Sequence, residues 1–179
     1  MADLTPILIY DNRFNANEWF VLSGLCVGIF FTYVLPRRFT TRLSILYFML
    51  GVSFGTAFDL TLGTIPVSYY DIGDASNYQL FDIISLFMYG PFSYLFFYLY
   101  DLLKVQVKFS PIYILVWSFV ALVLELVGVL VGEFHYQHGY GWQISLLIYL
   151  TVLSLWVLFH YLMKSAESPS RSRASGSNR

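Results

Sequence analysis

The chain has 179 residues, of which 58% are hydrophobic, 20% aromatic and only 12% charged, and its net charge is −1. A soluble domain carries about 25% charged residues, so this composition excludes an ordinary soluble fold and indicates an integral membrane protein. The sequence has no basic patch that would favour a nucleic-acid partner. The single cysteine, Cys26, excludes an intrachain disulfide and any CxxC motif. Residues 1–18 lack the pattern of a cleavable signal peptide.

Five runs of about 17–25 mostly apolar residues predict transmembrane helices. In chain order we expect the spans at 19–35, 44–67, 81–100, 111–131 and 143–163. Helices are favoured over strands because lipid offers no hydrogen-bond partner to exposed backbone groups, and because the runs do not alternate. A Gly-Pro pair in the third run predicts a kink near its middle. The predicted fold class is therefore all-α, an integral membrane bundle of five helices.

The basic residues predict the direction of the spans. Nine of the ten Lys and Arg residues lie in the 36–43 loop, the 101–109 loop and the C-terminal tail. The positive-inside rule makes that side cytoplasmic, so the N-terminus is outside and the C-terminus inside. Residues 1–18 are then extracytoplasmic and residues 19–164 form the membrane domain. We expect residues 165–179 to be a disordered, basic cytoplasmic tail, because they lack an apolar pattern.

Two carboxylic acids, Asp59 and Glu125, lie inside apolar runs, where a charge costs at least about 2.5–3.5 kcal/mol on insertion scales. Asp59 shares a helix face with Gly51, Gly55 and Gly63, and small residues surround Glu125 in the same way. Small-residue faces turn toward neighbouring helices. At about 1.5 Å per residue, Asp59 is expected roughly 12 Å and Glu125 roughly 9 Å below the outer ends of their spans. The pattern predicts one acidic pocket that opens outward.

Four other residues are predicted to contribute to this pocket. Asp82 and Tyr89 lie on one face of the third span, and Asp82 enters from the outer side. His135 belongs to a loop that can cover the pocket, and Trp142 begins the polar face of the fifth span. These residues are candidates for binding an ion or a ligand.

The same loop contains a weak metal pattern. Glu133, His135 and His138 have an E-x-H-x-x-H spacing of residue types that bind zinc, but no helix or hairpin in the sequence is certain to frame them. Motifs for nucleophilic catalysis, for a P-loop or for a dinucleotide are absent. The sequence therefore favours a protein that is not an enzyme and has no cofactor.

Two polar residues near the cytoplasmic side are interpreted as structural. We expect Asp101 to be a solvated partner of Lys104 three residues later. We expect His160 to lie at the membrane interface beside Lys164.

The second half of the chain also carries a recognisable pattern. Its parts are Phe81-Asp82-Ile83-Ile84 before Pro91, Trp117 before Glu125, the loop from Phe134 to Trp142, Ser145, and His160-Tyr161. This pattern resembles a family of small multi-spanning membrane proteins from Bacillus- and Clostridium-type spore formers. The resemblance covers roughly residues 44–164.

The resemblance implies a membrane fold and marks Asp59, Asp82, Glu125 and Trp142 as pattern positions, together with the His/Tyr loop. Tyr140, which lies between two glycines, is a local departure from the pattern. The family has no assigned activity, so the resemblance implies no function.

Three hypotheses follow for function. The leading one is a multi-pass protein of a bacterial plasma membrane whose outward-facing pocket binds protons, a cation or a small cationic ligand, for transport or sensing. The alternative is a structural or accessory subunit that packs on another membrane protein, or on a second copy, through its Gly-rich helix faces. The third is an enzyme with an acid/His site at the outer surface. The lipid bilayer is the expected partner in each case.

Overall fold

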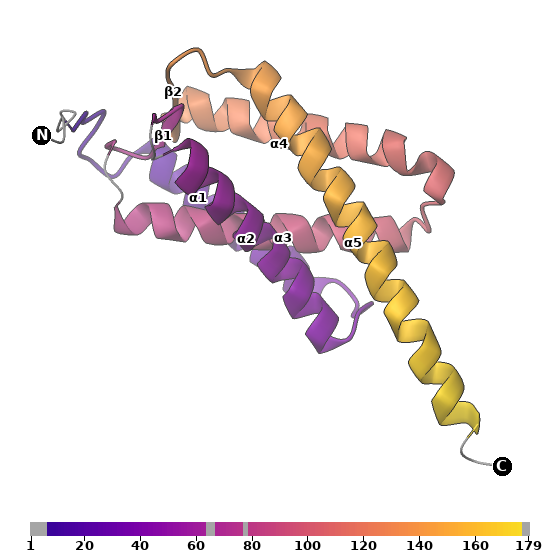
Figure 1. The fold of residues 1–179 in the computed structure, drawn as a ribbon. Coiled ribbons are helices and arrows are strands. Elements are labelled where there is room, and N and C mark those ends of the chain that lie inside the picture. Colours follow the sequence, from indigo (N-terminus) through magenta and orange to yellow (C-terminus); the bar gives the residue numbers. More distant parts are fainter. Residues whose placement is uncertain (1–6, 64–66, 77–78, 177–179) are drawn as a thin grey trace, which may run out of the picture.

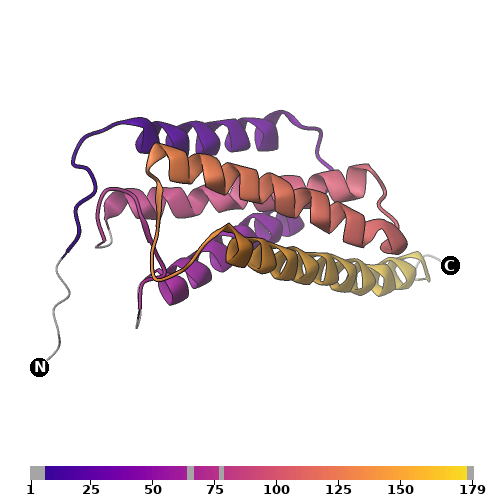
Figure 2. The same ribbon diagram turned by 90° about the horizontal axis from the view of Figure 1, so that it is seen from above.

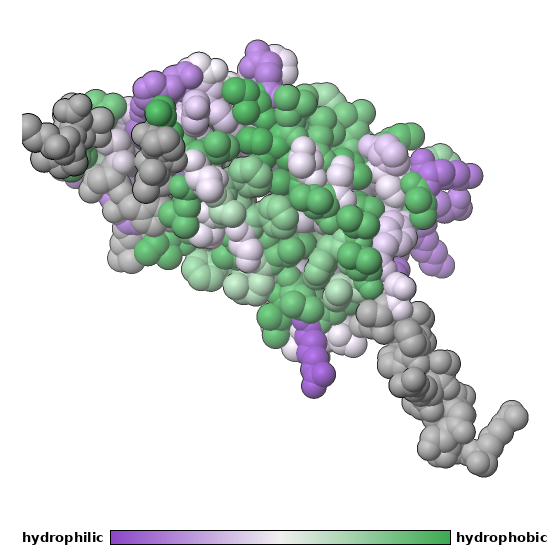
Figure 3. Space-filling model, viewed as in Figure 1, coloured by the Kyte–Doolittle hydropathy of each residue, from purple (hydrophilic) through white to green (hydrophobic). Residues whose placement is uncertain are grey.

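The computed structural model of the chain describes residues 7–63, 67–76 and 79–176. Five long helices make up most of it: α1 (Ala16–Val34), α2 (Thr41–Leu62), α3 (Leu80–Leu102), α4 (Ser110–Val131) and α5 (Trp142–Gly176). In this part of the chain all five are long and apolar enough to cross a membrane, which confirms the predicted fold class. Figure 3 shows hydrophobic residues over most of the visible face of the bundle and hydrophilic residues toward its ends.

The helices pack around α3. It contacts α1 on one side and α2 on another, while α4 packs against α5 and α1. Figures 1 and 2 show that the helices run back and forth between two ends of the bundle, so that successive connections lie at opposite ends. We call one end the sheet end, because it carries β1 (Tyr70–Ile72) and β2 (Phe134–Tyr136). We call the other the basic end, because it carries the α1–α2 and α3–α4 connections with their Arg and Lys residues.

A short two-stranded sheet joins the connections at the sheet end. β1 and β2 pair antiparallel, with Tyr70 opposite Tyr136, Asp71 opposite His135 and Ile72 opposite Phe134. The segment before α1 packs on this sheet, and Ile9 forms a single bridge to Ala75. This small sheet was not predicted from the sequence, from which we expected an all-α fold.

The end of α2 differs from the prediction. The helix stops at Leu62 rather than near residue 67, and residues 64–66 lie outside the described part. The N–H of Gly63 donates to the carbonyl of Asp59 at 2.9 Å, and the N–H of Tyr69 donates to the carbonyl of Leu62 at 2.7 Å. The returning chain thus satisfies a carbonyl that the helix end leaves open. Asp59 is consequently about 4.5 Å from the end of its helix, instead of the expected 12 Å or so.

The last helix is longer than predicted. α5 continues past residue 163 to Gly176, although we expected residues 165–179 to be disordered. Residues 177–179 lie outside the described part.

The proline in α3 does not interrupt that helix. α3 runs continuously from Leu80 to Leu102 with Pro91 inside it. Gly28 of α1 lies directly against this proline, because a Cβ added at Gly28 would fall 2.6 Å from the Cβ of Pro91. The glycine thus allows α1 to approach α3 at the point where the proline ring projects.

The hydrophobic core lies in the half of the bundle toward the basic end. It combines aromatic and aliphatic side chains of α2, α3, α4 and α5: Leu43, Tyr47, Phe96, Phe97, Tyr100, Ile114, Val152, Leu153, Trp156 and Val157. Tyr47 stacks on Phe97 with their ring centroids 3.9 Å apart. This dense aromatic packing holds the helices together below the cavity described next.

Candidate functional site

A cavity of about 100 Å³ lies between α2, α3, α4, α5 and the sheet. Asp59 and Glu125 both line it, and so does Tyr89, as the sequence predicted. Most of the remaining wall is aromatic. Among the residues that the structure describes, no Lys, Arg or His lines this cavity. Two acids therefore share a small space without a basic counterion in its wall.

Glu125 is surrounded by hydroxyl donors. Ser145 of α5 donates to its Oε1 at 2.5 Å, and the hydroxyl of Tyr136 donates to the same oxygen. The hydroxyl of Tyr149 donates to Oε2. A carboxylate that accepts several hydrogen bonds is stabilised and fixed in orientation. Both carboxyl oxygens of Glu125 are thus engaged by hydroxyl groups.

Asp59 has fewer partners. Its side chain is only 3% exposed, and Oδ1 accepts a 2.7 Å hydrogen bond from the hydroxyl of Tyr70. Oδ2 is buried and has no hydrogen-bond partner within the described residues. Buried polar atoms are almost always paired, so a lone buried carboxyl oxygen beside a cavity is an exception that calls for a ligand, a proton or water. No hydrogen bond joins Asp59 to Glu125.

The sheet connects the two acids through one cross-strand pair. Tyr70 and Tyr136 lie opposite each other in β1 and β2, yet Tyr70 donates to Asp59 and Tyr136 donates to Glu125. Burial raises the pKa of both phenols well above its usual value, and the acceptor carboxyl raises it further. Both tyrosines therefore remain hydrogen-bond donors at neutral pH. The sheet closes this end of the cavity, as we expected of the loop that contains His135.

A second group of acids lies beside the cavity at the sheet end. Glu133 is 2% exposed, and burial raises its pKa to about 8, with further contributions from Asp82, Glu18, Asp59 and Asp74. Asp82 is buried as well, but its Oδ2 accepts the backbone N–H of Gln79 at 2.6 Å. It therefore caps the start of α3 and does not line the cavity.

The other predicted site residues lie elsewhere. His135 stacks on Tyr10 with ring centroids 3.7 Å apart, and its Nε2 lies 3.1 Å from the carbonyl of Gly73. Trp142 is the first residue of α5 and is 47% exposed. Neither lines the cavity. They hold or flank the sheet end.

The predicted metal candidates are not assembled into a site. Nδ1 of His138 lies 2.7 Å from the carbonyl of Ser68, while His135 is engaged with Tyr10 and Gly73. Within residues 7–63, 67–76 and 79–176, no three His, Cys, Asp or Glu side chains are grouped so that they could hold a metal ion. The two histidines of the E-x-H-x-x-H pattern instead contact two different backbone carbonyls at the sheet end.

A second cavity, of about 260 Å³, adjoins the first between α1, α3 and α4. Its wall is mostly apolar and includes Gly24, Gly28 and Pro91. Tyr89 and Glu125 line both cavities, so the ring of Tyr89 belongs to the boundary between them.

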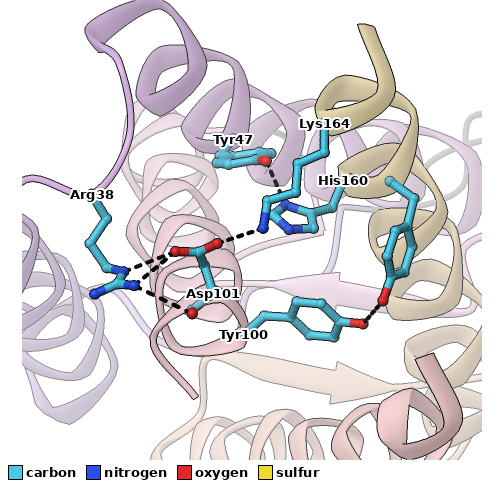
Figure 4. Close-up of polar contacts among 7 residues, drawn as sticks. Arg38, Tyr47, Tyr100, Asp101, His160 and Lys164 are labelled. Carbon is cyan, nitrogen blue, oxygen red and sulfur yellow. Dashed lines mark hydrogen bonds and ion pairs between the residues drawn. The ribbon is translucent and has the colours of Figure 1, made fainter. Parts of the chain in front are cut away.

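The basic end has a different polar cluster, shown in Figure 4. Asp101 pairs with Arg38 at 3.0 Å and with Lys164 at 2.7 Å, rather than with Lys104 as we predicted. The turn after α3 places Lys104 at a positive φ of 49°, where the helix has ended and the i+3 geometry no longer holds. Asp101 thus joins three segments of the chain.

His160 is buried inside the bundle at the same end. It is 1% exposed, and its Nδ1 lies 2.6 Å from the hydroxyl of Tyr47 (Figure 4). The aromatic rings of Phe97 and Tyr100 also pack around it. Its Nε2 is buried without a partner in the part of the chain that the structure describes.

Three tyrosines of the site were not among the predicted site residues. Tyr70, Tyr136 and Tyr140 all line the cavity. Ser145 and Tyr149 of α5 were not predicted as site residues either, and the hydroxyl groups of both donate to Glu125. The clustering of tyrosines in two loops was the available signal.

Comparison of the chain with known families, curated proteins and solved structures finds no match. The resemblance to the spore-former family stays a prediction.

Proposed function

We propose that this protein binds a proton or a small cation inside the membrane, in the cavity between Asp59 and Glu125, as part of transport or sensing. The observation that carries the proposal is the buried, unpartnered Oδ2 of Asp59 in a cavity that it shares with Glu125. Buried charges are paired in nearly all proteins, and intramembrane acids commonly mark ion or proton pathways. A bound cation or proton supplies the missing partner.

The orientation is part of the same proposal. The Arg and Lys residues of the basic end favour the cytoplasm, and the sheet end would then face outward. Asp59 lies three residues from the end of α2, so the cavity is close to the outer surface. We also propose the plasma membrane of a bacterium as its location, which only the resemblance and the apolar helices support.

The alternative role as an accessory subunit loses its main support. The glycine faces of α2 and α4 are occupied inside the bundle, because a Cβ at Gly55 would collide with the ring of Tyr89 and one at Gly128 with the ring of Phe134. These faces therefore do not provide a free surface for a partner. A bulky residue at either position is expected to disrupt the fold itself.

The test uses the purified full chain in proteoliposomes and in nanodiscs. Asp59→Asn and Glu125→Gln are compared with the wild type for proton uptake, for Na⁺ and K⁺ uptake, and for ion-dependent thermal stabilisation. Asp101→Asn serves as a matched carboxyl control at the other end of the bundle. We expect at least a tenfold loss of the ion or proton response in the first two variants and none in the control. Wild-type behaviour of both variants in all these assays would exclude the proposal.

A further inference from the structure

We infer that the cation bound in the cavity is a small alkylammonium ion that carries at least one N–H group. This inference rests on the proposed function and narrows its ligand from any cation or proton to one chemical class. Three features of the cavity carry it: the unpartnered oxygen, the aromatic wall and the volume.

The unpartnered oxygen of Asp59 requires a hydrogen-bond donor. Protonation of Asp59 would turn Oδ2 into a hydrogen-bond donor, which itself needs an acceptor when it is buried. A water molecule can donate to Oδ2, but it brings no positive charge to a cavity that contains two acids. An ammonium N–H supplies the donor and the positive charge together.

The wall favours an organic cation over a metal ion. Hard cations such as Ca²⁺ require about six to eight oxygen ligands. In this cavity both oxygens of Glu125 already accept hydroxyl groups, which leaves Oδ2 of Asp59 as the open carboxyl oxygen. The rings of Tyr89, Tyr140 and Trp156 line the same space. Aromatic rings attract alkylammonium ions through their electron-rich faces, and pack against the alkyl groups as well.

The volume limits the size of the ion. The cavity of about 100 Å³ is well below the roughly 300–1,000 Å³ of pockets for drug-sized ligands. Methylammonium and trimethylammonium are therefore suitable probes, since both keep an N–H group. Tetramethylammonium has the same charge but cannot donate a hydrogen bond to Oδ2.

The experiment measures binding of radiolabelled methylammonium to the purified full chain in nanodiscs at fixed pH. Unlabelled trimethylammonium, tetramethylammonium, Na⁺ and K⁺ compete. We expect trimethylammonium to compete at least tenfold better than tetramethylammonium, and Na⁺ and K⁺ not to compete. Asp59→Asn is expected to weaken methylammonium binding at least tenfold, while Asp101→Asn leaves it unchanged.

A pair of variants at Tyr89 tests the aromatic contribution. Its hydroxyl makes no hydrogen bond with any residue of the described ranges, so Tyr89→Phe is expected to keep binding within about threefold. Tyr89→Leu removes the ring and is expected to weaken binding at least tenfold. Size-exclusion elution and thermal unfolding of each variant report whether it is folded. If Tyr89→Leu is unfolded, the effect of Asp59→Asn on methylammonium binding still tests the inference.

The outcomes separate the two proposals. A proton or Na⁺ response that depends on Asp59, without methylammonium binding, overturns this inference and leaves the proposed function intact. Equal competition by tetramethylammonium, or binding that survives Asp59→Asn, also overturns it. If the Asp59 and Glu125 variants keep both the ion or proton response and methylammonium binding, this inference and the proposed function are both overturned.

Discussion

Asp59 and Asp101 lie at opposite ends of the same bundle and have opposite kinds of partner. Asp101 is held by two cations, Arg38 and Lys164, and forms part of a cluster that joins three segments (Figure 4). Asp59 lines the cavity and, among the residues that the structure describes, it has one phenol as its hydrogen-bond partner, no cation, and a buried oxygen that is unpaired. The same side chain is thus satisfied by the protein at one end and left open at the other.

The different partners of Asp101 and Asp59 distinguish an acid that stabilises the fold from an acid that is available to a ligand. At the basic end the acid stabilises a connection, and its pairs are partly exposed. At the sheet end three hydroxyl groups donate to Glu125, while aromatic rings line most of the cavity that contains Asp59. A fold gains nothing from an unpaired buried oxygen, so its presence favours a ligand over a structural role.

The largest expected effect concerns pH and Glu133 at the sheet end. Burial, together with the acids around it, raises its pKa from 4.5 to about 8 in the folded protein. The unfolded chain loses this proton near pH 4.5, whereas the folded protein keeps it until about pH 8. The free energy of unfolding therefore falls as the pH rises between these values, at up to about 1.4 kcal/mol per pH unit.

This prediction is checked by unfolding in detergent at pH 5 and pH 8. The stabilising contribution of Glu133 is complete below about pH 4.5 and is lost as the pH passes about 8. We expect Glu133→Gln to flatten the decline, while Asp101→Asn keeps it. An identical pH slope in Glu133→Gln and the wild type would show that the buried acid at this end is not the source.

The next effect is the loss of the Glu125 side chain. In Glu125→Leu the hydroxyls of Tyr136, Ser145 and Tyr149 lose their acceptor. An unsatisfied buried polar group costs about 1–3 kcal/mol, so we expect a loss of roughly 3 kcal/mol or more in the free energy of unfolding. Chemical denaturation in detergent measures it.

Glu125→Gln is the control for that substitution. It keeps an oxygen acceptor of the same reach, so we expect a loss of only about 1 kcal/mol. If Glu125→Leu is as stable as the wild type, the hydroxyl groups do not depend on the carboxylate, and the contrast between the two ends is wrong.

The five helices could be predicted from the sequence because each one is encoded by a pattern within its own residues. A run of apolar residues is local, and so is the spacing that placed Asp59 and Glu125 on inward faces. Tyr89 also follows from its helix face. All three line the cavity.

The non-local contacts could not be predicted. Tyr70 and Tyr136 are neighbours only because β1 and β2 pair, although α3 and α4 separate these strands along the chain. Strands of three residues are too short to show a periodicity in the sequence. Asp101 likewise meets Arg38 and Lys164, each 63 residues away, in place of the nearby Lys104. Local spacing gave the wrong partner because the helix ends immediately after Asp101.

The smallest and most direct comparison makes the same substitution at both ends. Asp101→Asn is expected to lower the free energy of unfolding by about 1 kcal/mol, because each partly exposed ion pair contributes about 0.2–1 kcal/mol. In 1 M NaCl this loss should shrink, since salt screens partly exposed charges. Unfolding of the two variants and the wild type at low and high salt measures both effects.

Asp59→Asn should behave in the opposite way when no ligand is present. Its amide oxygen can still accept from Tyr70, while the buried charge without a counterion is gone. Replacing an uncompensated buried charge by a neutral group is neutral or stabilising, so we expect no loss and a gain of up to about 1 kcal/mol. Salt should leave this difference nearly unchanged, because the Asp59 side chain is only 3% exposed and buried charges are screened much less than exposed ones. A loss as large as that of Asp101→Asn would mean that the carboxyl at position 59 is held by the fold, and the site would then be structural.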